Sequence, residues 1–272
     1  MGTSETFGLV LINWDGTWDL SAVQILVIMR RCSYPFGDFV NGKYDKTHEK
    51  FEEDMKRRFS LMTAEEKSFI SSMNFPVIYF KYWLILPETS LVPPAEKGKY
   101  ENRKDKFKRT FIQHDNGVQL QSWLNSTKHL ELFDLCEFPK GRASNADETP
   151  LETAIRETKE ETNIHEGLYD ILPDVPSIYH SFVGSDDRKS YGRTYFFGRM
   201  HKTPRMHATI SHNKRNQRLE VDNILWMPLG TLEKMVLLYA NVYQRVRNYC
   251  MAELMKQTGS PSPTLHEEPY TA

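Results

Sequence analysis

The chain contains 272 residues, of which 39% are hydrophobic and 26% are charged. A chain of this length can bury one large domain, or one domain that carries a substantial insertion. Its 35 basic and 36 acidic side chains give a net charge of −1, so the overall charge indicates no class of partner and only local charge is informative.

Targeting and cysteine patterns are not those typical of secreted or membrane-spanning proteins. The first residues lack the basic start and apolar stretch of a signal peptide, and no apolar run approaches the roughly 20 residues of a membrane span. The three cysteines, Cys32, Cys136 and Cys250, are odd in number and lack metal-ligand spacing, which indicates reduced thiols. We therefore expect a soluble protein of the cytosol or nucleus, without a membrane partner.

The first apolar segments predict a β-hairpin. Residues 7–14 (FGLVLINW) and 23–30 (VQILVIMR) are apolar and β-branched, and Asp15-Gly16 between them is a turn signal. We expect residues 1–35 to be the first part of a domain that resumes later in the chain.

Residues 36–128 have a different sequence pattern, which predicts a helical insertion. Residues from about Lys46 to Phe59 have apolar residues at helical spacing, at Phe51, Met55 and Phe59. Thr63 with Glu66 forms a capping box that begins a second helix. The apolar and aromatic stretch 75–86 is compatible with a helix or a strand, and we favour a helix.

The insertion contains a basic run that predicts RNA binding. Seven basic side chains stand against two acidic ones in this run: Lys97, Lys99, Arg103, Lys104, Lys106, Lys108 and Arg109. Tyr100, Phe107 and Phe111 are interleaved with them, and basic side chains neutralise phosphates while aromatic rings stack on bases. A solvated linker or helix face is the alternative explanation.

The first domain resumes over residues 129–257. Three strands are expected, at residues 132–138, 177–183 and 192–200. The polar residues 184–187 predict a turn between the last two strands, and residues 229–256 predict a long amphipathic helix. The tail, residues 258–272, contains glycine and three prolines and is expected to be disordered.

Residues 149–163 predict a helix with well-defined ends. Thr149 is a good N-cap, Pro150 occupies the first helical position without losing a hydrogen bond, and Glu152 completes a capping box. Asn163 suits the left-handed residue that closes a helix. Apolar and threonine side chains form the stripe that packs on a sheet: Leu151, Ala154, Ile155, Thr158 and Thr162.

Three carboxylates crowd one edge of this helix and indicate a metal site. Glu157 and Glu161 are one turn apart, with Glu160 beside them, so their ionised forms repel one another unless a cation compensates. Mg²⁺ and Mn²⁺ prefer carboxylate oxygens and complete their coordination with water and substrate phosphates. An isolated run of this kind is more often a solvated helix face.

The residues around this helix resemble the signature of the Nudix hydrolases, in which Gly, five residues and Glu are followed by seven residues and Arg-Glu-x-x-Glu-Glu-x-Gly. This chain supplies Gly141, Glu148 and, after seven residues, the sequence RETKEETN from Arg156. The resemblance implies an α/β/α sandwich with a mixed sheet, which the helical insertion interrupts. It also implies that Glu157, Glu160 and Glu161 hold the metals.

The same resemblance assigns supporting roles. Arg156 would orient Glu157, and Glu148 would support the loop through an ion pair. Independently of the resemblance, Lys140 and Arg142 flank Gly141, and we expect these three residues to meet the substrate phosphates.

This chain departs from the signature at three positions. Six residues, and not five, separate Gly141 from Glu148, Thr158 replaces an aliphatic residue, and Asn163 replaces the closing glycine. None of these departures removes a metal ligand, so we expect an active enzyme.

A second stretch carries a further resemblance. Glu220, Val221, Ile224 and Trp226 are similar to the Glu-Ile-x-x-Ile-x-Trp segment of mRNA-decapping Nudix enzymes. That segment's glutamate acts as a general base or an additional metal ligand, so the resemblance gives this role to Glu220. An exposed glutamate usually only faces solvent.

The combination of this segment, the glutamate-rich helix and the long insertion looks like the decapping enzymes of large cytoplasmic DNA viruses. The resemblance implies capped mRNA as partner, Mg²⁺ or Mn²⁺ as cofactor and the host cytoplasm as location. It implies release of methylated guanosine diphosphate and RNA with a 5′ monophosphate.

Two other functions stay open. The same site would also suit small nucleoside diphosphate, dinucleoside polyphosphate or diphosphoinositol derivatives. An RNA-binding protein with an inactive Nudix core is the alternative outside the enzymes.

Overall fold

A computed structural model describes residues 4–85, 94–183, 190–201, 208–211, 214–233 and 237–258. The chain forms two compact units, each assembled from separate segments. The first unit comprises Met1–Ile28, Phe138–Thr209 and Ile224–Ala272. The second comprises Met29–Glu137 and Ile210–Asn223. The predicted tail and the turn at residues 184–187 lie outside the described residues, except for Thr258 at the end of the last helix.

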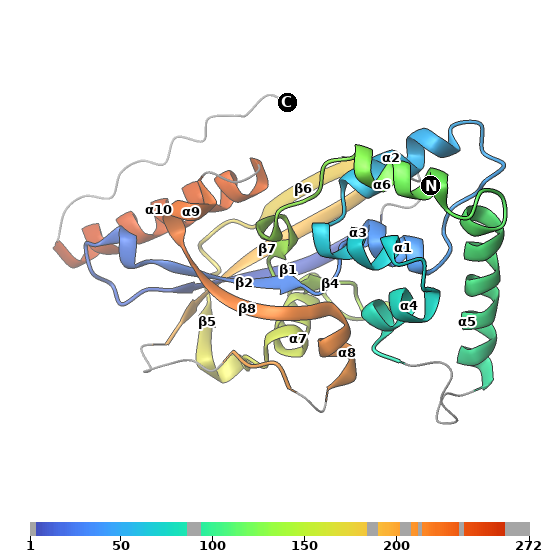
Figure 1. The fold of residues 1–272 in the computed structure, drawn as a ribbon. Helices are drawn as coiled ribbons and strands as arrows, with labels where there is room; N and C mark the ends of the chain where they lie inside the picture. Colours follow the sequence, from blue (N-terminus) through green and yellow to red (C-terminus); the bar gives the residue numbers. More distant parts are fainter. Residues whose placement is uncertain are drawn as a thin grey trace. The chain divides into compact units, whose positions relative to one another are not determined.

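The first unit is built on a mixed β-sheet (Figure 1). Its strand order is β2-β1-β7-β5, with β4 and β6 pairing at the sides and β8 paired with β2. The bounds are β1 (Ser4–Asn13), β2 (Gln24–Arg30), β4 (Lys140–Gly141), β5 (Tyr169–Ile171), β6 (Ile178–Val183), β7 (Ser190–Met200) and β8 (Val221–Pro228). The predicted N-terminal hairpin is confirmed, because β1 and β2 pair antiparallel with Ile12 opposite Ile25.

β1 is a central strand that is covered on both faces. It pairs in parallel with β7 and antiparallel with β2 and β4. Its run Leu9–Ile12 has no exposed surface, as expected for a strand buried on both sides.

Helices lie on both faces of this sheet (Figure 1). On one face α7 (Pro150–Thr162) packs Ala154 against Leu9, Leu11 and Leu26. On the other, the Phe138 ring contacts Tyr195 and Tyr239, with ring centroids 5.4 and 5.0 Å apart. Tyr239 belongs to α10 (Leu237–Thr258), which follows the short α9 (Leu229–Leu232). The predicted α/β/α sandwich is therefore confirmed.

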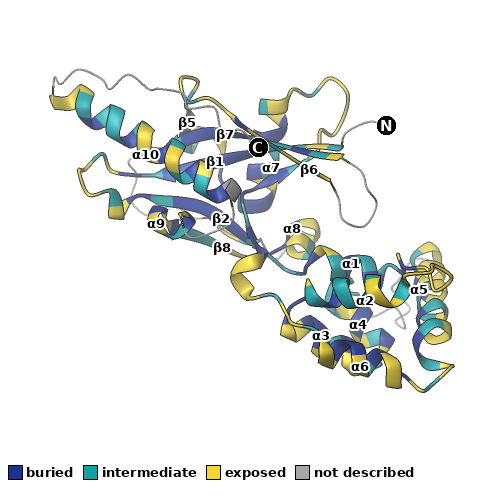
Figure 2. Ribbon diagram, turned by 90° about the horizontal axis from the view of Figure 1, so that it is seen from above, coloured by how far each residue is buried: buried dark blue, intermediate teal, exposed yellow. Residues whose placement is uncertain are grey.

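The second unit is mainly helical (Figure 2). Its helices are α1 (Tyr34–Val40), α2 (Phe51–Ser60), α3 (Ala64–Ser71), α4 (Phe75–Trp83), α5 (Pro94–Phe107), α6 (Val118–Ser126) and α8 (Arg215–Glu220). The helix predicted from about Lys46 to Phe59 is confirmed by α2, but it begins only at Phe51. The helices predicted after Thr63 and over residues 75–86 are confirmed by α3 and α4, of which α4 ends at Trp83.

Aromatic rings form the centre of this helical core. The ring of Phe39 lies 5.9 Å from Phe59, 6.0 Å from Phe107 and 5.5 Å from Phe111 between centroids. A π-helical turn, Lys108–Ile112, continues α5 and brings Phe111 into this group. The rings thus join helices that are far apart in the sequence.

The strand predicted over residues 132–138 is wrong for most of its length. Leu132–Leu135 forms a 3-10 helix, and only Cys136–Glu137 is a strand, β3. The Asp134 carboxylate accepts a hydrogen bond from the backbone N–H of Glu131 at 2.9 Å, which favours a turn over a strand. Leu132 and Phe133 are 60% and 64% exposed, so these apolar side chains are not buried against a sheet.

Glu66 is a buried carboxylate on which the start of the second unit depends. It accepts hydrogen bonds from the Ser33 backbone N–H at 2.6 Å, the Ser33 hydroxyl at 2.8 Å and the Thr63 backbone N–H at 2.9 Å. We predict that Glu66→Ala lowers the free energy of unfolding by about 3 kcal/mol, because two buried N–H groups lose their acceptor.

Urea unfolding of the two neighbouring variants measures this effect. Glu65 is 61% exposed and, among the described residues, forms its ion pair with Lys81, so Glu65→Ala is the control and should cost less than about 1 kcal/mol. Similar small losses for both variants would contradict the prediction.

Candidate active site

The ends of α7 match the sequence prediction. The Thr149 hydroxyl accepts from the Glu152 backbone N–H at 3.3 Å, and the Glu152 carboxylate accepts from the Thr149 N–H at 2.8 Å. Asn163 closes the helix with φ of 59°, and its N–H donates to the Lys159 carbonyl. Asparagine therefore replaces glycine here in the left-handed conformation that it tolerates best.

The threonines on the inner face of α7 are buried but satisfied. The Thr158 hydroxyl donates to the Ala154 carbonyl at 2.8 Å, and the Thr162 hydroxyl donates to the Thr158 carbonyl at 2.6 Å. A hydroxyl in place of an aliphatic group thus leaves no unpaired polar group in the core.

Arg156 is the centre of an ion-pair network at the outer edge of α7. Its Nε lies 2.7 Å from Glu148, and its Nη1 lies 2.8 Å from Glu157 and 3.2 Å from Glu160. Its Nη2 donates to the Arg142 carbonyl at 2.7 Å, so the loop before the helix is tied to the same guanidinium. The carboxylates, Glu148 first, raise the pKa of Arg156.

Glu148 is held in its ionised form by the same network. Its hydrogen bond with Arg156, together with the bond from the Ser144 backbone N–H, lowers the pKa of Glu148 to about 2. The extra loop residue is accommodated nearby, where the Asn145 side chain accepts from the N–H groups of Asp147 and Glu148, each at 3.0 Å. The loop is therefore ordered by its own side chains.

Gly141 leaves the space into which Glu157 extends. A Cβ atom at position 141 would collide with the Glu157 carboxylate, so any other residue would displace this side chain. The adjacent Lys140 backbone N–H donates to the Glu161 carboxylate at 3.0 Å. The side chain of Lys140 is buried and Arg142 is exposed. The glycine loop and the acidic edge of α7 thus form one site in the first unit.

The donor set fits a divalent cation that is completed by its substrate. In the described part of the chain, no group of three or more acidic, histidine or cysteine side chains by itself forms a metal cage. At the acidic edge, Arg156 forms ion pairs with both Glu157 and Glu160. Mg²⁺ usually takes one or two carboxylates, with waters and phosphates as further ligands, and these oxygens suit that role.

Glu220 belongs to the second unit. It is the exposed last residue of α8, directly before β8, and its backbone carbonyl accepts from the Arg31 N–H at 2.9 Å. The acidic residues of α7 belong to the first unit. The role of Glu220 toward them stays a prediction.

The basic run lies on α5 and the turn after it, and its members differ in exposure. Lys97, Lys99, Lys108 and Arg109 are exposed. Lys106 donates to the Gly42 carbonyl at 2.7 Å. The remaining two, Arg103 and Lys104, are partly buried, and each lies over a tyrosine ring.

The interleaved aromatic residues do not stack on bases, contrary to the sequence interpretation. Tyr100, Phe107 and Phe111 are buried in the helical core, where they contact other rings. Helical spacing explains the error, since the polar and apolar faces of α5 alternate along the sequence.

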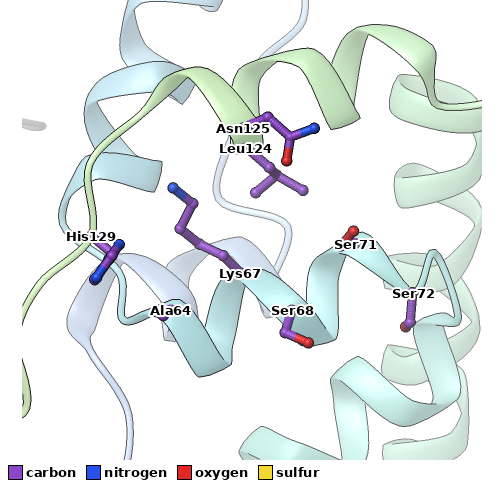
Figure 3. Close-up of a pocket in the computed structure, with 8 residues that line it drawn as sticks. All are labelled: Ala64, Lys67, Ser68, Ser71, Ser72, Leu124, Asn125 and His129. Atoms are coloured by element: carbon purple, nitrogen blue, oxygen red, sulfur yellow. The ribbon is translucent and has the colours of Figure 1, made fainter.

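A shallow hollow of about 480 Å³ in the second unit is a separate feature (Figure 3). Its lining includes Lys67 and His129, between α3 and the segment that begins in α6. The Lys67 ammonium donates to the Thr127 carbonyl, the Thr127 hydroxyl and the Lys128 carbonyl. Its three N–H groups are thus used within the protein, and burial lowers the pKa of Lys67. We assign no catalytic role to this hollow.

No helix among the residues that the structure describes is long and apolar enough to cross a membrane.

A mixed sheet between helices, with a glycine loop beside a carboxylate-rich helix, suits a hydrolase of phosphate anhydrides. The NUDIX domain model matches residues 111–246, half of the chain. The chain therefore belongs to the Nudix family and is a Nudix pyrophosphohydrolase. Enzymes of this family generally use divalent metal ions.

Viral proteins are among its relatives. The chain is 27% identical over 207 residues to mRNA-decapping protein g5R of African swine fever virus (isolate Warthog/Namibia/Wart80/1980), covering 75% of this chain and 77% of that protein. It is 24% identical over 177 residues to a putative mRNA-decapping protein of Acanthamoeba polyphaga mimivirus, covering 60% of this chain and 48% of that one. A solved Ap4A hydrolase from C. elegans aligns at 13% identity and a TM-score of 0.43, over 92% of this chain and 98% of that chain.

The low pKa of Glu148 predicts how its contribution to the stability of the folded protein depends on pH. A carboxylate whose pKa is lowered on folding stabilises fully above its unfolded pKa of about 4.5, and this contribution is lost as pH falls toward 2. Glu148→Gln should therefore destabilise the protein at pH 6, with a difference from the wild type that shrinks on acidification to pH 3.

Denaturation at several pH values measures that difference. Asp147→Asn is the matched control, because this adjacent carboxylate forms no ion pair in the described parts of the chain and its loss should have little effect. A Glu148→Gln difference that is constant from pH 6 to pH 3 would refute the assignment.

Proposed function

We propose that this enzyme removes the cap of mRNA, releasing methylated guanosine diphosphate and RNA with a 5′ monophosphate. The observation that carries the proposal is the extent of the similarity to the viral decapping protein. The Nudix match spans residues 111–246, whereas the similarity to g5R covers 207 residues. The shared sequence thus extends beyond the Nudix match, which supports a common substrate.

The acidic edge of α7 supplies the proposed chemistry. Glu157, Glu160 and Glu161 would hold Mg²⁺ or Mn²⁺, which would neutralise phosphate oxygens when bound. Arg156 orients Glu157, and Lys140 and Arg142 flank the glycine turn at which the phosphates bind. Glu148 keeps the loop in place through Arg156.

Glu220 acts on the attacking water in this proposal. It orients the water or accepts its proton, a role that is typically worth roughly 10² to 10⁴-fold in rate. The water oxygen bonds to phosphorus, and the bond between the phosphate on the RNA and the next phosphate of the cap breaks. The proposed location is the cytoplasm, which is that of the host if the protein is viral.

Glu161→Gln tests the metal assignment. The glutamine can still accept the Lys140 N–H hydrogen bond, so the loop should keep its position while a charged ligand is lost. We expect turnover to fall by more than about 100-fold, since loss of even a supporting partner of a metal ligand costs 10- to 100-fold. RNA affinity should stay close to that of the wild type.

The assay follows the release of methylated guanosine diphosphate from cap-labelled RNA with Mg²⁺ or Mn²⁺. Small nucleoside diphosphates, dinucleoside polyphosphates and diphosphoinositol phosphates are tested in parallel. Turnover of these alone would replace decapping by metabolite hydrolysis. RNA binding without any turnover would favour an RNA-binding protein with an inactive Nudix core.

The exposed part of the basic run is proposed to bind the RNA body. Replacing Lys97, Lys99 and Lys108 by glutamate should weaken RNA binding and reduce the slope of log affinity against log salt by about three, roughly one per phosphate contact. Arg103 and Lys106 are left unchanged, because they are partly buried and donate hydrogen bonds inside the unit, whereas the pair of Lys99 with Glu96 is exposed.

Binding of RNA at several salt concentrations measures both effects. The control carries the same charge change at three other exposed lysines of the second unit, Lys46, Lys50 and Lys128. An equal loss of affinity in the control would show that only net charge matters. An unchanged affinity in the test variant would remove α5 from the RNA-binding surface.

A further inference from the structure

One residue of each of four strands lies in a single row across the sheet of the first unit. Gly141 of β4 pairs with Phe7 of β1, Phe7 pairs with Thr194 of β7, and Thr194 pairs with Tyr179 of β6. Side chains of residues directly opposite one another lie on the same face of a sheet. Phe7 packs against the core that contains Ala154, so this is the face that α7 covers.

The two ends of the row differ in chemistry. At one end, the Glu157 carboxylate fills the space above Gly141. At the other end, Tyr179 is 58% exposed and belongs to β6, which pairs with β7. Three inter-strand spacings of about 4.8 Å separate these ends, or about 14 Å along the row. This is comparable to the reach of a nucleotide from its terminal phosphate to its base.

The exposed ring of Tyr179 has a defined position. Its phenol end lies against Gly192 of β7, where an added Cβ atom would lie 2.9 Å from the hydroxyl and 3.0 Å from a ring carbon. No other aromatic ring stacks on it among the described residues. The glycine thus lets the ring lean onto the sheet and leaves aromatic surface open.

Neighbouring aromatic residues do not offer the same surface. His180 and Phe182 are one and three residues after Tyr179, so their side chains point to the opposite face of the sheet. Tyr191 pairs with Phe182 and therefore lies on that opposite face as well. Their rings stack on one another at 5.9 and 5.4 Å, and the Arg193 guanidinium covers Phe182 at 4.5 Å. Their aromatic surfaces are already used within the protein.

We infer that Tyr179 stacks on the base of the nucleoside diphosphate whose phosphates bind beside Gly141 and Glu157. This inference rests on the proposed function and names the residue that recognises the leaving nucleotide. A methylated guanine is cationic, and the face of a tyrosine ring attracts cations, so the methylated base should bind more tightly than the unmodified one.

Binding of methylated guanosine diphosphate, the product, tests the inference directly, because no turnover is needed. Stacking of one base on an aromatic side chain is worth 1–3 kcal/mol, which corresponds to roughly a 5- to 150-fold change in Kd. Tyr179→Leu should therefore raise Kd at least about fivefold, with an equal rise in KM for capped RNA and little change in kcat. Tyr179→Phe keeps the ring and should bind like the wild type.

Two further variants separate the ring position from general damage. Gly192→Ala leaves Tyr179 intact but displaces its phenol end, so it should weaken binding in the same direction. Trp18→Leu removes another exposed aromatic side chain of the first unit that is not in this row, and should leave Kd unchanged.

The outcomes distinguish this inference from the proposed function. If the wild type removes caps while Tyr179→Leu and Gly192→Ala keep its Kd and KM, the inference fails and decapping stands. If the wild type does not remove caps but Tyr179→Leu weakens binding of guanosine or adenosine diphosphate, decapping fails and the base site stands. Equal losses in Tyr179→Leu and Trp18→Leu would overturn the assignment to this row.

Discussion

The guanidinium of Arg156 connects the parts of the first unit on which its proposed chemistry depends. One side chain contacts Glu148 in the loop, the Arg142 carbonyl after the glycine turn, and two of the three carboxylates proposed to hold metal. These contacts couple the position of the loop to the positions of the carboxylates. A cation that draws Glu157 and Glu160 toward substrate would compete with Arg156 for the same oxygens.

The two units are stabilised by different kinds of core. The first buries a strand on both faces and keeps charged groups at one helix edge, whereas the second assembles short helices around contacting aromatic rings. The buried Glu66 carboxylate fixes the start of α1 relative to α3 inside that second core. The basic surface of α5 is thus supported by a core that includes its own aromatic residues.

Local signals explain why the catalytic helix and its caps were predictable. Thr149, Pro150 and Glu152 act on backbone groups within one turn, so their effect can be read from adjacent residues. The burial of Tyr100 and Phe111 could not be read in this way, because it depends on helices far away in the sequence. The row that ends at Tyr179 requires the registers of three strand pairs, including the parallel pair of β1 and β7, and no local pattern encodes these.

The pairing of β1 with β7 has a consequence for synthesis on the ribosome. Ser4 lies opposite Tyr191, a separation of 191 − 4 = 187 residues. At roughly 5 to 20 residues per second, β1 waits about 10 to 40 s for its parallel partner. Residues 29–137 emerge in that interval, so most of the helical unit is available to fold first. The nascent chain must therefore keep one of its most apolar segments from aggregating while the strand that will cover its edge has not yet been translated.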